Sequence, residues 1–145
     1  MILVDANLLL YAYDPRSSHH EASRVWLETV MSQSDLVRFA WLSLWAFLRI
    51  STNPRVYERP LSIAEAEDAV SSWLVQPMAG ILEPGERHWP ILRGLTRGGQ
   101  TTGPLVMDAA LAAIAIEHGA TLCTTDRDFA RFDELRWTNP LISSP

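Results

Sequence analysis

The chain has 145 residues, of which 48% are hydrophobic and 20% are charged, so it can build one globular core and is not expected to be intrinsically disordered. Its net charge of −5 argues against a protein that holds nucleic acid through a bulk positive field, but it is compatible with an acidic site that recruits a metal ion. A single cysteine excludes an internal disulfide, and the short apolar runs and the lack of a basic leader argue against a membrane partner and a signal peptide, so we expect a cytoplasmic location.

The chain alternates short apolar runs with longer helical patterns, which predicts an α/β fold with a parallel sheet. Residues 2–4 form a continuous apolar run and predict a buried strand that ends at Asp5. Ser18 and Glu21 have the spacing of a capping box, which predicts the start of a helix. The apolar face of this helix is expected to contain Ala22, Val25, Trp26 and Val30.

The middle of the chain predicts a strand and two helices. Residues 36–39 form a possible short strand, and residues 42–51 predict a helix that ends before the next proline, because proline disfavours helix at the residue before it. Ser62 and Glu65 form a second capping box. The apolar face of the helix after it is expected to contain Ala66, Ala69, Val70, Trp73 and Leu74.

The second half of the chain continues the alternation. Pro84 is expected in the first turn of a helix that Gly98 and Gly99 close, and the alanine-rich residues 105–118 predict a long helix ended by Gly119. The other expected elements are a strand at 81–82, a loop at 101–104, a strand at 121–125, a helical turn around Phe129 and Phe132, and an edge strand at 136–138. The predicted order is therefore β-α-α-β-α-α-β-α-α-β-α-β.

Four aspartates are expected to meet at one edge of this sheet. Asp5 and Asp126 each follow an apolar strand, and ligands of open parallel sheets bind beyond the carboxyl ends of the strands, where the strand order reverses. Asp108 lies near the start of the helix that feeds the second strand, and Asp128 follows two residues after Asp126. Crowded carboxylates repel one another, and a hard cation such as Mg²⁺ or Mn²⁺ relieves this repulsion. Such an ion supports the hydrolysis of a phosphodiester bond.

Each acid also has a structural interpretation. Asp5 can cap a helix that follows the first strand, Asp126 can cap the turn after it, and Asp108 can be a polar spot on a solvated helix face. The chain contains neither a glycine-rich phosphate loop nor a G-x-S-x-G elbow, and Cys123 falls in a predicted buried strand. An NTPase, a serine hydrolase and a cysteine nucleophile are therefore not expected.

Three segments of the chain resemble a known family. They are MILVDANLLLYAYD at the start, FLRISTNPRVY in the middle and DAALAAIAIEHGATLCTTDRDFARF near the end. They resemble the PIN domain, and specifically VapC-type toxins, over essentially the whole chain. The resemblance implies a three-layer α/β/α fold with a central parallel sheet, as a single domain over residues 1–145. It also implies an endoribonuclease that uses Mg²⁺ or Mn²⁺, is neutralised by a cognate VapB-type antitoxin and forms a homodimer.

The resemblance assigns candidate catalytic residues. By motif position, Asp5, Asp108 and Asp126 are the expected metal ligands, and Asp128 is the accessory acid. The family usually has a glutamate in the helix after the second strand, whereas this chain has Ala46 at that place. The acidic set is therefore one carboxylate short. Three alternatives are open: the remaining aspartates suffice to bind the metal, an acid from elsewhere in the chain substitutes for the glutamate, or the metal is bound weakly.

Four further residues are expected to support the site. Asn7 matches the polar residue two positions after the family's first aspartate, and Thr124 matches the hydroxyl residue that precedes the acid after the fourth strand, here Asp126. Arg49 and Arg127 are expected to contact the RNA, because arginine suits bidentate contacts with phosphate. For Arg127, an ion pair with a neighbouring site acid is an equal alternative.

Functions of different classes remain open. The first is an endoribonuclease toxin, and the second is a catalytically weak PIN domain that acts mainly as an antitoxin-binding module in a DNA-bound regulatory complex. The missing glutamate favours the second. A third, a metal-dependent phosphatase for small substrates, lacks the expected D-x-D motif after the first strand. Most of the six tryptophans are expected in the core, but one or both of Trp41 and Trp45, four residues apart, are expected to be partly exposed for the antitoxin.

Overall fold

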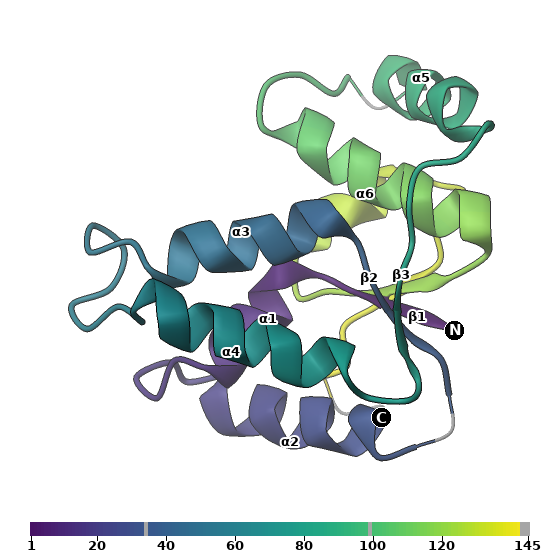
Figure 1. The fold of residues 1–145 in the computed structure, drawn as a ribbon. Coiled ribbons are helices and arrows are strands. Elements are labelled where there is room, and N and C mark those ends of the chain that lie inside the picture. Colours follow the sequence, from purple (N-terminus) through teal and green to yellow (C-terminus); the bar gives the residue numbers. More distant parts are fainter. Residues whose placement is uncertain (34, 99, 143–145) are drawn as a thin grey trace.

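A five-stranded parallel sheet runs through the centre of the protein, whose computed structural model describes residues 1–33, 35–98 and 100–142 (Figure 1). The strands are β1 (Ile2–Val4), β2 (Val37–Phe39), β3 (Ala79–Ile81), β4 (Thr121–Cys123) and β5 (Trp137–Thr138). They lie in the order β3-β2-β1-β4-β5, and each neighbouring pair is parallel. The element order predicted from the sequence is confirmed, with a 3₁₀ helix as the last helical element.

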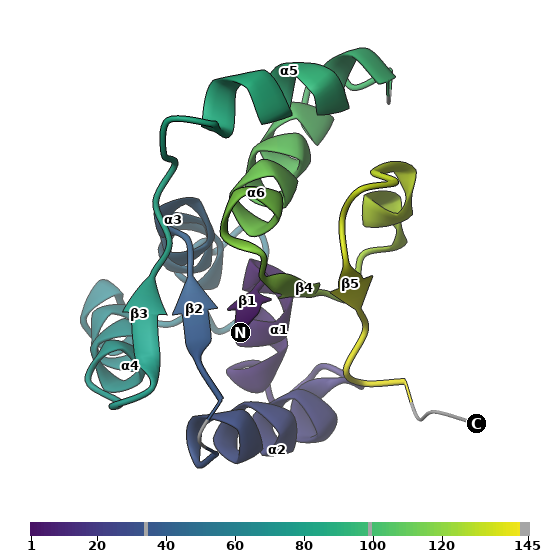
Figure 2. The ribbon, with the colours of Figure 1, turned by 90° about the vertical axis from the view of Figure 1, so that its right-hand side faces the viewer.

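Helices cover both faces of this sheet. They are α1 (Ala6–Ala12), α2 (His20–Met31), α3 (Trp41–Ser51), α4 (Ile63–Leu74), α5 (His88–Gly98), α6 (Leu105–His118) and the 3₁₀ helix η1 (Arg127–Arg131). Buried side chains of α5 and α6 pack on one face, and those of α1 to α4 pack on the other (Figure 2). The three-layer α/β/α architecture is therefore confirmed. Within the described ranges, the helices lack the length and apolar character needed to cross a membrane.

The alternation of side chains along the strands divides the core into two halves. Leu3 of β1 and Leu122 of β4 belong to the half under α6, and the next residues, Val4 and Cys123, belong to the half under α1. All four side chains are buried. Burial raises the pKa of the Cys123 thiol to about 12, so this cysteine is a core residue and not a nucleophile, as expected.

Helix α6 has the bounds predicted from the sequence. Its small side chains let it pack closely, and Ala109, Ala112, Ala113 and Ala115 are all buried. It ends at Gly119, which has a φ of 68°, a left-handed conformation that favours glycine. The end of α6 is therefore followed directly by the start of β4. The first turn of α6 lies at the other end of the strands, near their carboxyl ends.

The two predicted capping boxes have different outcomes. Ser62 and Glu65 form the box as expected, with both reciprocal hydrogen bonds present. The box at Ser18 was wrong, because α2 has His19 at its N-cap and no side-chain cap. The Ser17 hydroxyl instead accepts a hydrogen bond from the backbone N–H of His19 at 3.1 Å. The register of α2 also leaves Val25 exposed, against the prediction.

The helix expected to begin near Pro84 begins later, at His88. The cause is Glu117, at the end of α6, whose carboxylate accepts hydrogen bonds from the backbone N–H groups of Gly85 and Arg87 at 2.7 and 3.0 Å. These contacts hold the segment before α5 as a loop. Helix α5 ends at Gly98, as predicted, whereas Gly99 lies outside the described residues.

Candidate active site

The carboxyl ends of β1 and β4 form the edge at which the candidate site lies. Val4 and Cys123 are partners in register, and the backbone N–H of Asp5 donates to the carbonyl of Cys123 at 3.0 Å. The chain passes from β1 to β2 on one side and from β4 to β5 on the other, so the strand order reverses between β1 and β4. The segments that carry Asp5 and Asp126 therefore start side by side, as predicted.

Three aspartates bring carboxylate oxygens together at this edge. One oxygen each of Asp108, Asp126 and Asp128 lies within 4.8 Å of the others. Asp108 lies in the first turn of α6, and Asp126 caps η1 by accepting a hydrogen bond from the backbone N–H of Asp128 at 2.9 Å. The capping interpretation of Asp126 and its place among the clustered acids are thus compatible. A donor set of oxygens alone suits a hard divalent cation, so these residues fit Mg²⁺ or Mn²⁺.

Asp5 is a half-buried carboxylate beside this cluster. Its Oδ1 accepts a hydrogen bond from the backbone N–H of Ala6 at 2.7 Å and so caps α1, and its Oδ2 accepts one from the Thr124 hydroxyl at 2.7 Å. The pKa of Asp5 is raised above its ordinary value, mainly by burial. The two hydrogen bonds lower this pKa, and the negative charge of Asp126 raises it, so the combined effect is still an increase. Among the described residues, Asp5 is not one of the three clustered acids, but its charge raises the pKa of Asp108.

The Thr124 hydroxyl joins the ends of the two strands. Besides donating to Asp5, it accepts hydrogen bonds from the side-chain amide of Asn7 at 3.2 Å and from the backbone N–H of Asp126 at 3.0 Å. These three contacts use the one donor and two acceptor positions of a hydroxyl group. Thr124 is completely buried, so the network is shielded from water. Asn7 and Thr124 therefore lie where they can fix the orientation of the acids.

The carboxyl group of Asp108 titrates far from its ordinary range. Its pKa is raised from 3.8 to about 6, first by burial and then by the charges of Asp126, Asp5 and Asp128, while Arg131 lowers it. At neutral pH the fold therefore keeps these negatively charged carboxylates close together although they repel one another. A bound cation would remove that repulsion.

A pocket of about 420 Å³ opens beside these acids. Asp5 and Asp108 line it on the side of β1 and α6, whereas α3 contributes Trp45, Ala46 and Arg49 to the opposite side. The place of the family's usual glutamate is thus on the pocket wall. Helix α3 contains no acidic residue, so the acidic set gains no carboxylate from this wall.

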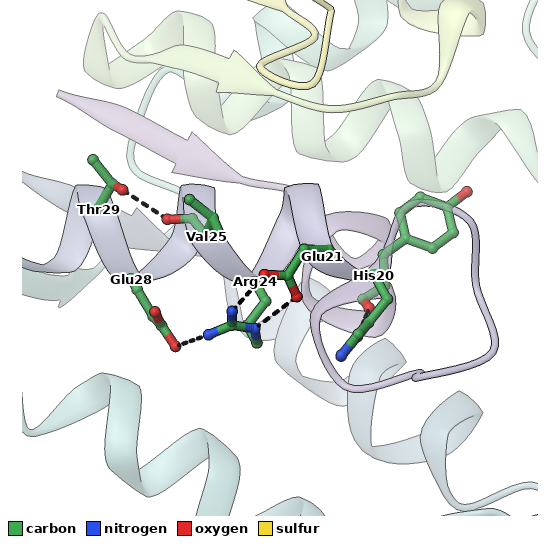
Figure 3. A network of polar contacts seen from close by, with 7 residues as sticks. His20, Glu21, Arg24, Val25, Glu28 and Thr29 are labelled. Carbon is green, nitrogen blue, oxygen red and sulfur yellow. Dashed lines mark hydrogen bonds and ion pairs between the residues drawn. The ribbon is translucent and has the colours of Figure 1, made fainter.

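The exposed arginines differ in whether their charge is already compensated. Figure 3 shows Arg24 on α2, whose guanidinium pairs with Glu21 at 2.6 Å and with Glu28 at 2.8 Å. Arg49 and Arg127 are also exposed, but neither forms an ion pair with an acid of the described chain. The ion-pair alternative for Arg127 was therefore wrong, and both guanidinium groups can contact phosphate.

Two features of the site were not predicted. Arg131 donates a hydrogen bond from Nε to the carbonyl oxygen of Asp128 at 3.1 Å, and its charge acts on Asp108. The spacing of three residues from Asp128 on a helical turn is the signal that could have indicated it. Met107, next to Asp108, also lines the pocket and is 55% exposed.

Metal binding should depend on pH because Asp108 must lose its proton to act as a ligand. With a pKa of about 6, it is ionised above that pH and protonated below it. We expect the affinity for Mn²⁺ to be nearly constant above about pH 7 and to fall by up to about tenfold per pH unit below about pH 6. Calorimetric titration across this range measures it, with Asp68→Asn on the exposed face of α4 as a control that keeps the profile. A constant affinity down to about pH 5 would remove Asp108 from the ligand set.

Comparison with known proteins identifies the family. The PIN domain profile matches residues 2–135. Ribonuclease VapC37 of Mycobacterium tuberculosis is 43% identical over 140 residues, which cover 97% of this chain and 97% of that protein.

Solved structures share the fold. The crystal structure of VapBC2 from Rickettsia felis, bound to a DNA fragment from their promoter, matches with a TM-score of 0.70 and 17% identity, covering 96% of this chain and 98% of that one. VapC20 of Mycobacterium tuberculosis, a Sarcin-Ricin loop cleaving toxin, matches with a TM-score of 0.64 and 19% identity, covering 94% and 99%. Profile, sequence and fold agree over nearly the whole length, and the chain belongs to the PIN domain family and, within it, to the VapC ribonucleases.

Proposed function

We propose that this protein is a metal-dependent endoribonuclease that hydrolyses phosphodiester bonds of RNA and serves as the toxin of a toxin–antitoxin pair. The observation that carries the proposal is the cluster of Asp108, Asp126 and Asp128 beside a pocket that is also lined by the exposed Arg49. Relatives of this chain at about 40% identity are named ribonucleases, which supports catalysis over a purely binding role. The alternative of a catalytically weak antitoxin-binding module is therefore not favoured.

The acids have distinct roles in this proposal. Asp5, Asp108 and Asp126, with Asp128 as the fourth carboxylate, would hold Mg²⁺ or Mn²⁺, which supplies charge neutralisation for the phosphodiester and an activated water. Asp126 also orders η1 through its cap, which keeps Asp128 beside it. Thr124 and Asn7 orient Asp5 from the buried side.

The arginines act on the substrate. Arg49 lies on the pocket wall opposite Asp108, so its guanidinium can hold a phosphate of the RNA while the acids act on the neighbouring one. Arg127 follows the cap residue Asp126 and is exposed, so it can bind the strand as it leaves the site. Together they offset the negative charge of the acid cluster, which would otherwise repel RNA.

The partners follow from the relatives. A solved neighbour is a VapBC complex on promoter DNA, which supports a VapB-type antitoxin as the partner of this chain. The confirmed partial exposure of Trp41 and Trp45, at 40% and 62%, leaves apolar surface for partners. We further propose a single domain over residues 1–145 and a homodimer, for which light scattering of the antitoxin-free protein is the direct measurement.

Metal removal is the decisive test of the proposed activity. Purified antitoxin-free protein should cut total cellular RNA into discrete fragments with Mg²⁺ or Mn²⁺, and should not cut it with chelator, because crowded carboxylates without an ion repel the phosphodiester. Restoring the ion to the chelated sample should restore cleavage, which controls for irreversible loss of the fold. Absence of cleavage with either ion, from protein shown to be folded by circular dichroism, would overturn the enzyme and favour the binding module.

A further inference from the structure

The two walls of the pocket beside the acids differ in chemistry. The wall of β1 and α6 carries Asp5 and Asp108, whereas the wall of α3 carries the indole of Trp45, the methyl group of Ala46 and the guanidinium of Arg49. Most residues that line this pocket belong to α3 and α6, whose positions in the fold Figure 1 shows. Since α3 contributes no acid, its side of the pocket is not built to bind the ion. It is built from an aromatic plane and a cation.

Trp45 exposes most of its surface beside this pocket. Its side chain is 62% exposed although it lies on the same helix as Leu44 and Phe47, which are buried in the core. Ala46 beside it is the smallest side chain that keeps the helix intact, so the pocket remains open next to the indole. Across the pocket, Met107 is 55% exposed and presents a flexible thioether to the same space. Apolar surface therefore faces the pocket from both sides above the acids.

The positions of Trp45 and Arg49 match one nucleotide step. Residues four apart on a helix lie on the same face, about one turn from each other. Arg49 forms no ion pair with an acid of the described chain, so it can hold a phosphate, and the indole lies one turn away toward the start of α3. Aromatic side chains bind nucleic acid by stacking on bases, but only when the base is not already stacked and paired in a duplex.

We propose that Trp45 is a stacking platform for one unpaired base of the RNA beside the cleaved phosphodiester, and that this contact makes the enzyme prefer single-stranded segments. The proposal rests on the proposed ribonuclease function. The carboxylates fix where the reacting phosphodiester lies, Arg49 holds an adjacent phosphate, and the base between them covers Trp45. An RNA strand is favoured over a protein partner because the pocket combines Asp5 and the clustered acid Asp108 with Arg49, which forms no ion pair with an acid of the described residues, and this combination complements alternating phosphates and bases.

The test measures binding separately from cleavage. A fluorescein-labelled single-stranded RNA of mixed sequence is titrated with protein in Ca²⁺ and followed by anisotropy, and the same strand annealed to its complement serves as the duplex probe. Trp45→Ala should weaken single-strand binding by about tenfold, Trp45→Phe should restore most of it, and duplex binding should not change. The matched control is Trp89→Ala on α5, an equally exposed tryptophan, at 64%, that does not line the pocket.

Further outcomes separate the possible failures. An abasic nucleotide placed at the stacking position should weaken binding to the wild type but not to Trp45→Ala, since the contact is already lost. Equal binding by wild type and Trp45→Ala would overturn the stacking platform while leaving the nuclease intact. A Trp45→Ala enzyme that cuts RNA normally but is no longer neutralised by the antitoxin would also overturn the stacking platform, because Trp45 would then bind the protein partner. Wild-type protein that binds the strand through Trp45 yet does not cut it with Mn²⁺ would instead refute the nuclease and keep the stacking contact.

Discussion

Replacing Asp108 with asparagine should lower metal-dependent RNA cleavage by at least about 100-fold, because the substitution removes one of the three clustered carboxylates that offer a ligand oxygen. Asparagine has nearly the same shape, so the loss reflects charge and not space. Initial cleavage rates at saturating Mn²⁺, together with Mn²⁺ affinity by calorimetry, measure the effect. Asp68→Asn, which changes the net charge equally on α4, should retain the wild-type rate and shows that bulk charge is not responsible.

The stability of the same variant distinguishes a lost ligand from a damaged fold. Because the folded pKa of Asp108 is about 6 and its ordinary value is 3.8, the folded state holds the proton more tightly than the unfolded chain does, and the ion-free protein loses stability as pH rises through this window. The Asp108→Asn substitution removes this penalty. After allowance for solvent screening of a partly exposed group, the variant should be more stable by about 1 kcal/mol at neutral pH and equal near about pH 4. Urea unfolding in chelator tests this. A destabilised variant at neutral pH would attribute the lost activity to the fold.

The convergence of the acids was predictable because it depends on topology. Asp5 and Asp126 follow apolar strands, and parallel strands end at the same edge, so their neighbourhood needed only the pairing of β1 with β4. Asp108 followed from the long alanine-rich pattern, whose start and end the sequence marks clearly. These signals are local and strong, and the structure agrees with them.

The finer arrangement was not predictable because it depends on the exact geometry of turns and on contacts between distant residues. Asp128 lies in the acid cluster because the cap of Asp126 turns the chain into η1. The late start of α5 depends on Glu117, about thirty residues beyond it, which a local helix-start rule does not consider. The failed capping box at Ser18 has a local cause, since the turn before α2 places His19 at the N-cap.

The missing glutamate acquires a structural meaning from the pocket. Ala46 lies between Trp45 and Arg49 on the α3 wall, which also includes Leu42 and Ser43, so its place in the position of an acid leaves this wall without a carboxylate. In the proposed metal site, the clustered oxygens come from Asp108, Asp126 and Asp128, at the junction of α6, β4 and η1, with Asp5 beside them. The remaining acids depend more strongly on their positioning, and this dependence makes the buried hydroxyl between Asp5 and Asp126 important.

Thr124→Val should reduce cleavage by about 10- to 100-fold, as expected when a group that orients a metal-site carboxylate is lost. Valine keeps the shape of threonine in this fully buried position but cannot donate to Asp5 or accept from Asn7 and Asp126. The lost hydrogen bond is one of the contacts that lower the pKa of Asp5, so this pKa should rise further in the variant.

The pH profile then separates positioning from a general structural role. Because Asp5 must be ionised to act, the acidic limb of the Thr124→Val rate profile should shift to higher pH, and activity should recover partly as pH increases. Thr124→Ser restores the hydroxyl and should return both the rate and the limb close to the wild type. A valine variant with a lower rate at every pH but an unshifted limb would mean that Thr124 serves packing alone. A shifted limb that serine reverses would show that one buried hydroxyl sets the charge of Asp5 and links β1 to β4 at the site.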